Sequence, residues 1–284
     1  HKFKLINDKN MLKKIKKNLF DSIKEPLVMG VLNITPDSFY DGGKYLKVRE
    51  AIKQINKMID EGVDIIDVGA FSSRPFSKEI SLDEEKKRLF PILKKLVKNY
   101  SKTLISIDTC RKEIAESSLN LGASIINDIS GGEYDKSMFK FIAKNNVPYI
   151  LMHMRENPST MQTNIKYHDF EKSIIKFFKN KSSELKSLGH TNLIIDPGFG
   201  FGKKINQNFK LINLIPKLKK INQHVLVGLS RKSMIYKTIG ASPEKSLNAT
   251  SILNTICILK GANILRVHDV KEAKECITLC EYLY

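Results

Sequence analysis

Short hydrophobic runs alternate with longer amphipathic segments along most of the chain. From Pro26 onwards, runs rich in Val and Ile are followed by stretches with helical periodicity, the pattern of parallel strands joined by helices. The runs predict eight strands, at residues 27–33, 63–68, 104–108, 124–128, 148–152, 193–196, 225–229 and 264–267. Because eight strand and helix pairs close a barrel, we expect an α/β fold, a (β/α)₈ TIM barrel in a single domain over residues 26–284.

The segments between these runs are typical of helices that cover a barrel. Residues 49–61 and 169–188 place apolar side chains on one face and Lys and Glu on the other. A glycine follows four predicted helices, where a left-handed conformation lets the chain turn towards the next strand. These glycines are Gly62, Gly122, Gly189 and Gly261. An open doubly wound sheet is the alternative, but the first strand lacks a GxGxxG turn.

The first 25 residues predict a helical extension outside the barrel. Their apolar residues recur at helical spacing among lysines, which also fits a membrane-surface helix or a targeting sequence. Asp8, Asp21 and Glu25 interrupt the basic face, whereas transit peptides are poor in acidic residues. We therefore expect a helix that covers the barrel floor.

Composition and charge narrow the class of protein. The 284 residues are 42% hydrophobic and 27% charged, and no apolar run is long enough to cross a bilayer, so we expect a soluble protein with no membrane partner. Lys and Arg exceed Asp and Glu by 48 to 30, a net charge of +18, which fits a Lys-rich composition, polyanion binding or the attraction of anionic substrates. A nucleic-acid-binding protein is the alternative from another class. No helix-turn-helix or zinc finger supports it, and we predict no nucleic-acid partner.

The four cysteines indicate a reducing, cytoplasmic location. They form no CxxC pair and are too few for the disulfide framework of a small secreted domain. Cys276 and Cys280 are four residues apart in a helical pattern, which favours two small buried apolar side chains over a metal pair.

Polar residues stand at or just after the carboxyl ends of all eight predicted strands, where (β/α)₈ barrels place their chemistry. Any one of them could be a helix cap or part of a salt bridge, but together they suggest a ligand site. Acceptors for the N–H groups of a planar heterocycle are Asp67, Asp108, Asn127 and Asp196. Donors to an anion are Lys232, Arg266 and His268. The two sets predict a ligand with a guanidine-like ring and a phosphate tail.

Two turns add to this site. The stretch GFGFGK at 198–203 lacks the spacing of a phosphate-binding P-loop, and its glycines favour a close approach of the backbone to a ligand on which Phe201 packs. The alternative is a tight turn whose phenylalanines only fill the core. The turn SRKS at 230–233 opens a helix, where free N–H groups beside cations favour an anion. His153 could bind a metal, but a structural histidine at a strand end is the more common case.

The same residues carry a resemblance to the dihydropteroate synthase family, from Leu27 to the end of the chain. The matching motifs are MGVLNITPDSF at 29–39, DGG at 41–43, DVG at 67–69, SSRP at 72–75, IDT at 107–109, IND at 126–128, LMHM at 151–154, DPGFGFGK at 196–203, GLSRKSM at 228–234 and RVHDV at 266–270. Their order on one barrel is far more specific than any single motif. The resemblance implies a transferase that joins 6-hydroxymethyl-7,8-dihydropterin diphosphate to p-aminobenzoate in folate biosynthesis, the target of sulfonamides.

The resemblance also implies the role of each matching residue. The pterin would be held by Asp108, Asn127, Asp196, Lys232 and Arg266. The diphosphate would be held by Asn33, Ser73, Arg266 and His268, with Mg²⁺ as cofactor on Asn33. The p-aminobenzoate side would be Ser73, Arg74, Pro75, Phe201 and Ser233. The groups closest to the reaction would be Asn33, Asp67, Lys232, Arg266 and His268, with Asp67 near the diphosphate.

One position departs from the family pattern. Between Gly69 and Ser72 the family usually has Gly followed by Glu or Gln, whereas this chain has Ala70 and Phe71, which we expect to change the hydrogen bonding of the loop. A related pterin-binding methyltransferase is the nearest alternative, although its substrates carry no diphosphate. The family also implies a homodimer, for which the last helices, including the Cys276 and Cys280 face, are a candidate interface.

Overall fold

Eight parallel strands form one sheet at the centre of the molecule. The computed structural model describes residues 25–34, 44–70, 80–155, 165–222 and 224–283. The strands are β1 (Leu27–Asn33), β2 (Ile65–Gly69), β3 (Leu104–Asp108), β4 (Ile125–Asp128), β5 (Tyr149–Met152), β6 (Leu193–Asp196), β7 (Leu226–Val227) and β8 (Ile264–Val267). Their order is β6-β5-β4-β3-β2-β1-β8-β7. Because a single parallel bridge between Ile195 and Val225 joins the two edges, the sheet is a nearly closed barrel.

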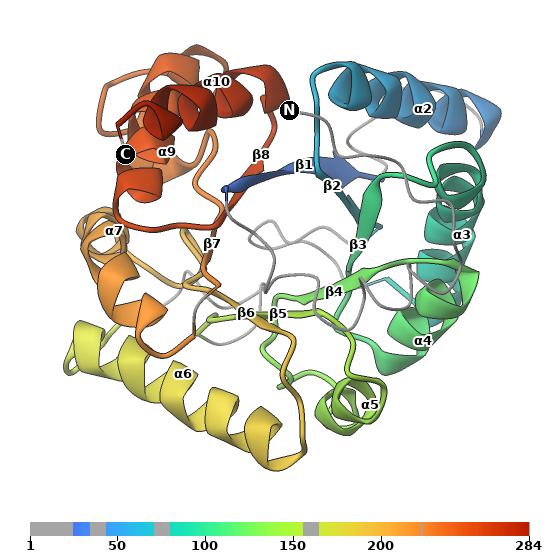
Figure 1. Ribbon diagram of the computed structural model, residues 1–284, viewed down its shortest axis with the longest axis horizontal. Helices are drawn as coiled ribbons and strands as arrows, with labels where there is room; N and C mark the ends of the chain where they lie inside the picture. The colour runs from blue at the N-terminus through green and yellow to red at the C-terminus, as the bar shows by residue number, and fades with distance from the viewer. Residues whose placement is uncertain (1–24, 35–43, 71–79, 156–164, 223, 284) are drawn as a thin grey trace.

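Helices surround this barrel as an outer ring (Figure 1). They are α2 (Lys44–Asp60), α3 (Leu82–Asn99), α4 (Lys112–Leu121), α5 (Met138–Asn145), α6 (Phe170–Ser187), α7 (Ile205–Lys219), α8 (Ser233–Tyr236), α9 (Leu247–Leu259) and α10 (Val270–Glu281), with a 3₁₀ turn η2 (Glu244–Ser246). Local sequence explains several starts: α3 begins where Ser81 Oγ accepts a hydrogen bond from the Glu84 N–H, and α6 where Asp169 accepts one from the Lys172 N–H. No helix in the described ranges could span a membrane.

The single-domain α/β prediction is confirmed, with corrections at the ends of elements. Strands β1, β3, β6 and β8 have the predicted bounds, whereas β7 is reduced to two residues and α2 begins five residues before the predicted start. The glycines expected to be left-handed have φ values of 83° (Gly62), 114° (Gly122), 82° (Gly189) and 100° (Gly261). The predicted N-terminal helix lies outside the described residues, apart from Glu25.

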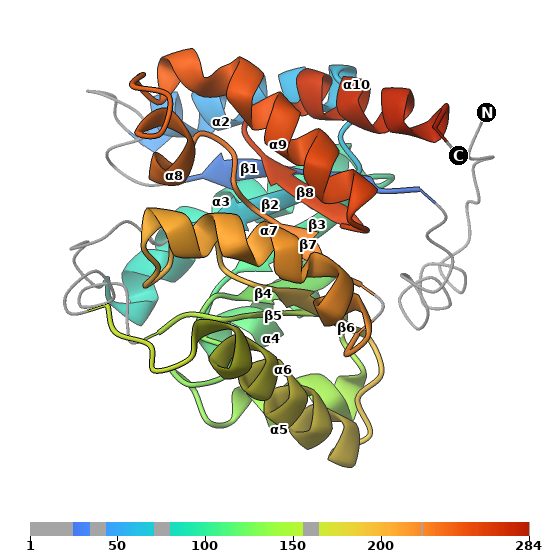
Figure 2. The ribbon, with the colours of Figure 1, turned by 90° about the vertical axis from the view of Figure 1, so that its left-hand side faces the viewer.

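Two apolar layers hold the barrel together. The larger lies between strands and helices, and a smaller one fills the barrel interior. The interior layer takes one residue from seven of the strands: Met29, Ile65, Ile125, Ile150, Ile194, Leu226 and Ile264. Because side chains alternate along a strand, the residues two positions further on also face the interior, towards the carboxyl ends of the strands. In Figure 2 the β1 arrow points to the end of the molecule where α8 lies.

Candidate active site

The second interior layer of the barrel is polar. Two positions beyond the apolar layer stand Asp67 on β2, Asn127 on β4, Asp196 on β6 and Arg266 on β8. The strand register places Asp67 beside Ser106 on β3 and Met152 beside Asp196. The strands therefore bring together residues that lie up to two hundred positions apart in sequence.

Asp67 is the centre of this layer. It is completely buried, and its carboxylate accepts hydrogen bonds from Ser106 Oγ (2.6 Å), Asn127 Nδ2 (3.1 Å) and Arg266 Nε (2.8 Å). The sequence suggested a strand-end position, but the structure places Asp67 in the middle of β2, inside the barrel. With a partner on three other strands, it is suited to orient the residues around it.

Asp108 lies one layer closer to the carboxyl ends, at the end of β3. Its Oδ2 accepts a hydrogen bond from Arg266 Nη2 at 3.1 Å. Burial and the nearby Asp67 carboxylate raise the pKa of Asp108 to about 7, against the opposing effect of Arg266. Although burial opposes its charge, the carboxylates of Asp67 and Asp108 raise the pKa of Arg266, which keeps the guanidinium charged. Gly69 leaves room here, because a Cβ on it would lie 3.3 Å from the Asp108 Cβ.

Asn127 has an unused acceptor in the barrel interior. Its side chain is 2% exposed, and Nδ2 is bonded to Asp67, but Oδ1 has no hydrogen-bond partner within the described part of the chain. A buried polar atom without a partner is uncommon in folded proteins and often marks the place of a ligand or water. This carbonyl oxygen is available to an N–H group of a bound heterocycle.

Asp196 and Lys232 form the other part of the site. Asp196 Oδ1 accepts a hydrogen bond from the Gly198 N–H at 2.7 Å, and burial raises the pKa of Asp196 although Lys232 opposes this. Lys232 Nζ donates to the Phe199 carbonyl at 2.5 Å and lies 4.7 Å from the centre of the Phe201 ring. Burial lowers the pKa of Lys232 to about 8, partly offset by Asp196.

The remaining predicted residues lie around the carboxyl ends of β1, β7 and β8. Ser230 Oγ and His268 Nδ1 are 3.1 Å apart, Ser233 is the first residue of α8, and Asn33 is an exposed residue at the end of β1. Ser73, Arg74 and Pro75 lie outside the described residues, as does Phe71. Ala70 is buried.

Ser106 was not among the predicted site residues, and the contacts of Arg231 and Lys203 were not predicted although both residues lie in predicted motifs. Ser106 could have been found from the alternation along β3, since it stands two positions before Asp108. Arg231 forms a bidentate ion pair with Asp269 (2.8 and 2.9 Å), and Lys203 is buried against main-chain carbonyls. Nothing in the local sequence indicates the pairing of Arg231 with Asp269 or the contact of Lys203 with the His153 carbonyl, because these partners come from distant segments.

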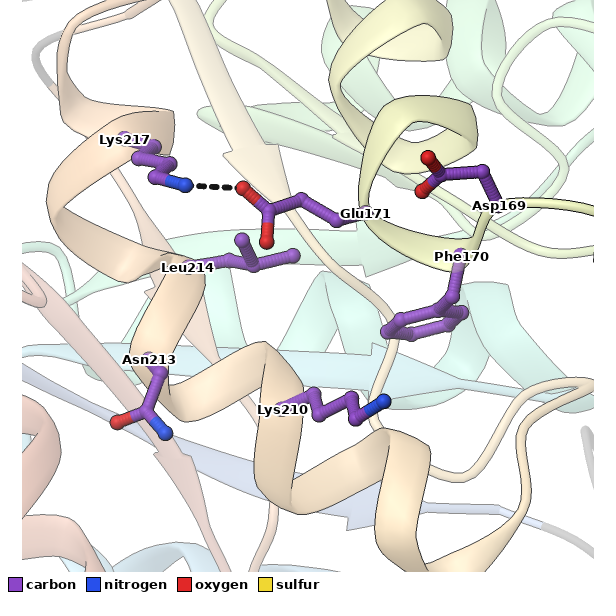
Figure 3. Close-up of a pocket in the computed structure, with 7 residues that line it drawn as sticks. All are labelled: Asp169, Phe170, Glu171, Lys210, Asn213, Leu214 and Lys217. Atoms are coloured by element: carbon purple, nitrogen blue, oxygen red, sulfur yellow. Dashed lines mark hydrogen bonds and ion pairs between the residues drawn. The ribbon is translucent and has the colours of Figure 1, made fainter.

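Other candidate sites lie apart from this cluster. The pocket of about 450 Å³ in Figure 3 lies between α6 and α7 and is lined by helix residues such as Phe170, Leu214 and the ion pair of Glu171 with Lys217. His153 is buried beside the rings of Phe177 and Phe178 on α6, and its Nδ1 has no hydrogen-bond partner within the described residues. The described residues contain no cluster of three or more His, Cys, Asp or Glu suited to a metal ion.

Known proteins of one family are similar to this chain over most of its length. Residues 29–268 match the family described as pterin binding enzyme. Dihydropteroate synthase of Escherichia coli K12 is 38% identical over 261 residues, which cover 91% of this chain and 92% of that protein. The folate synthesis bifunctional protein of Arabidopsis thaliana is 40% identical over 282 residues, 93% of this chain but 58% of that protein. The chain thus spans about half the length of the plant bifunctional proteins that it matches.

A solved structure shows the same fold. The crystal structure of the Yersinia pestis dihydropteroate synthase in complex with a sulfonamide drug has a TM-score of 0.85 and 34% sequence identity. The similarity covers 92% of this chain and 95% of that one. The overall fold is therefore shared with a protein whose crystal structure is a complex with a sulfonamide drug.

Proposed function

The chain belongs to the pterin-binding enzyme family, among the dihydropteroate synthases, and we propose that it joins 6-hydroxymethyl-7,8-dihydropterin diphosphate to p-aminobenzoate in folate biosynthesis. One observation carries the proposal: the carboxyl-terminal end of the barrel combines buried carboxylates and an unused amide oxygen with the cations Lys232 and Arg266. A pterin has N–H groups that can donate to the carboxylates and the amide oxygen, and a diphosphate has negative charge that the two cations can bind.

Asn127, Asp108 and Asp196 would form the floor for the pterin ring. The free Oδ1 of Asn127 and the two carboxylates supply acceptors for the ring N–H and amino groups, and Lys232 supplies a donor for the ring oxygen or nitrogen. Asp67 would act indirectly, since its hydrogen bonds to Ser106, Asn127 and Arg266 orient these neighbouring side chains.

The diphosphate would be held by Arg266 and His268, with Ser73 and Asn33. An exposed amide oxygen at the end of β1 fits Mg²⁺, which commonly takes one or two protein oxygens and completes its shell with water and phosphate oxygens. When bound there through Asn33, Mg²⁺ would neutralise charge on the leaving diphosphate. Ser73 would add a hydroxyl donor from the loop after β2.

The p-aminobenzoate would lie near Phe201 and Ser233, with Ser73, Arg74 and Pro75 from the loop after β2. Helix α8 has only four residues, so its dipole is small, and the hydroxyl and N–H groups of Ser233 would be the main donors to the carboxylate. The Phe201 ring offers an apolar surface for the aromatic ring.

The reaction needs no protein nucleophile. The C–O bond of the pterin methylene breaks with its electron pair leaving on diphosphate, the amine of p-aminobenzoate forms the new C–N bond, and that nitrogen then releases one proton to solvent. The residues of the chain bind both substrates, orient the amine towards the methylene and stabilise charge on the leaving group. Sulfonamides would compete with p-aminobenzoate.

We further propose that the protein is a cytoplasmic homodimer. The four cysteines are free thiols, as expected in a reducing compartment. Cys276 and Cys280 are buried, so they form no exposed interface, but α9 exposes Ile252, Ile256 and Leu259 on one face.

The proposed reaction is tested by measuring dihydropteroate and diphosphate produced from the two substrates with Mg²⁺. We expect Lys232→Ala and Asp196→Asn each to lower kcat/KM by about 100-fold or more, because each removes a charged contact to the reacting substrate. Lys217→Ala, which removes an outer lysine between α6 and α7, should leave turnover unchanged and is the matched control. A wild-type protein that binds the pterin but releases no diphosphate would refute the proposal.

A further inference from the structure

The side chain of Lys203 is buried beside the loop formed by residues 198–202, here called the glycine loop. Lys203 is 4% exposed, and its Nζ donates hydrogen bonds to the carbonyls of His153 (3.1 Å), Gly198 (2.9 Å) and Phe201 (2.9 Å). All three partners are main-chain carbonyls. The ammonium therefore joins the end of β5 to two points of the glycine loop.

This contact is costly to form. Burial lowers the pKa of Lys203 well below its usual value, and only the Asp196 carboxylate opposes that effect. A buried ammonium is tolerated when its donors are fully used, as they are here. The loop also approaches β5 closely, since a Cβ on Gly198 (φ 68°) would lie 2.1 Å from the His153 carbonyl oxygen. The position of the loop is thus fixed to within a narrow range.

Two further side chains bind the glycine loop. Asn208 of α7 is buried, and its Oδ1 accepts a hydrogen bond from the Gly200 N–H at 2.6 Å. Its Nδ2 donates to the carbonyls of Lys203 (3.2 Å) and Lys204 (2.9 Å), which ties the loop to the start of α7. Tyr167 Oη donates to the Gly202 carbonyl at 3.1 Å. Side chains therefore form the hydrogen bonds of backbone groups in the loop that have no partner in a strand or helix.

The glycine loop determines the surroundings of Lys232. The Phe199 carbonyl accepts the 2.5 Å hydrogen bond from Lys232 Nζ, and Phe201 places its ring 4.7 Å from the same nitrogen. Gly200 lies against the Lys232 stem, because a Cβ on it would be 3.4 Å from Cδ. A displaced loop would therefore move both the ammonium and the ring, whereas Asp196 would keep its place on β6.

We propose that Lys203 is a positioning residue, which with Asn208 fixes the glycine loop so that Phe201 and Lys232 meet the substrates in a productive arrangement. The inference rests on the proposed function for the identity of those substrates. It does not place Lys203 in contact with either of them.

The kinetic test compares Lys203→Met, which keeps the length of the side chain and removes the ammonium, with wild type. We expect kcat to fall and the KM for p-aminobenzoate to rise by about tenfold or more each, because small displacements of positioned groups are costly. Calorimetric Kd for the pterin diphosphate should rise by only about threefold, since Asn127, Asp108 and Asp196 are retained. Lys203→Arg, which keeps a cation and its donors, should recover part of the loss.

A second measurement needs no substrate. The chain contains no tryptophan, so Phe201→Trp would place a single indole, excited selectively over the tyrosines, on the glycine loop. In that background, Lys203→Met should lower the fluorescence anisotropy of the indole while the far-ultraviolet circular dichroism stays the same. Lys217→Met, a substitution of the same kind on the outer face, should leave the anisotropy unchanged.

The outcomes separate this inference from the proposed function. Unchanged anisotropy together with an unchanged KM for p-aminobenzoate in a folded Lys203→Met protein would overturn the inference. If Lys203→Met does not fold, Asn208→Asp keeps the acceptor for Gly200 and removes both donors, and a lower anisotropy in that variant supports the inference while an unchanged one overturns it. A wild-type protein without turnover would instead remove the proposed function, because the anisotropy is read without substrates.

Discussion

Asp108 and Lys232 are buried ionisable residues of the proposed pterin site, and their pKa values are both displaced towards neutrality. Burial raises the pKa of Asp108 to about 7 and lowers that of Lys232 to about 8. Asp108 accepts N–H groups as a carboxylate, above its pKa, and Lys232 is a cation below its own. We therefore expect kcat/KM for the pterin diphosphate to rise with pH through about 7 and to fall above about 8, measured as a pH profile of initial rates.

A pair of variants assigns the two limbs of this profile. Asp108→Asn has no titratable group at this position. Its kcat/KM should be lower but measurable, and its pH profile should lack the rise near pH 7. Lys232→Arg stays charged, so its fall should move to higher pH. A rise that persists unchanged in Asp108→Asn would show that another group, such as the substrate diphosphate, controls that limb.

Sequence reasoning at the residue scale found the types of side chain but not their depth in the barrel. From the sequence, Asp67, Asp108 and Asp196 were all expected at strand ends. The structure separates them, because Asp67 lies a layer below Asp108 and is enclosed by Ser106 and Arg266. Depth depends on how far neighbouring strands are staggered, and a single sequence contains no record of that stagger.

At the scale of elements, the Arg231–Asp269 ion pair joins the turn after β7 to the turn after β8. Arg231 has φ 54°, a left-handed conformation that costs a residue with a side chain about 1 kcal/mol or more. Its guanidinium also donates to the carbonyls of Pro243 (3.0 Å) and Glu244 (2.8 Å), just before α9. The contacts hold a strained residue between three segments.

Replacement of Arg231 by Gly or by Ala separates the strain from the contacts. Both variants lose the ion pair, but Gly adopts positive φ freely, so Arg231→Gly should be more stable than Arg231→Ala by about 1 kcal/mol in urea unfolding. At Lys176, an exposed position within α6, the order should reverse, because Gly is the poorer helix former. If Arg231→Ala were more stable than Arg231→Gly, the order expected at Lys176, the left-handed backbone at Arg231 would be relaxed in solution.

The strands and the main helices were predictable because each carries its own period. The β-branched runs gave β1, β3, β6 and β8 with correct bounds, and the glycines after helices gave the turns. The short β7 was overextended, since Gly228 and Leu229 are buried and apolar in sequence but already belong to the turn. Helix α8 and the turn η2 have too few residues to show a period at all.

At the scale of the whole molecule, closure of the barrel creates the site. Strands β6 and β7 meet at one bridge, and only then do Asp196 on one side and Arg266 on the other face the same interior. Eight periodic units in the sequence were enough to predict closure. The sequence motifs that resembled the family identified the ring of polar residues. The contact of Lys203 with His153 and that of Arg231 with Asp269 required the folded structure, because these partners lie on other units.

The proposed dimer is the property of the whole molecule that a single substitution can test. Helices α9 and α10 lie side by side on the outer ring (Figures 1 and 2), where α9 exposes Ile252, Ile256 and Leu259. Since an apolar stripe of this kind favours burial against a second copy, Ile256→Glu should convert a dimer into a monomer, measured by sedimentation velocity. Leu188→Glu, at an exposed apolar position after α6, should remain dimeric. A wild-type monomer, or a dimer that survives Ile256→Glu, would exclude this face as the interface.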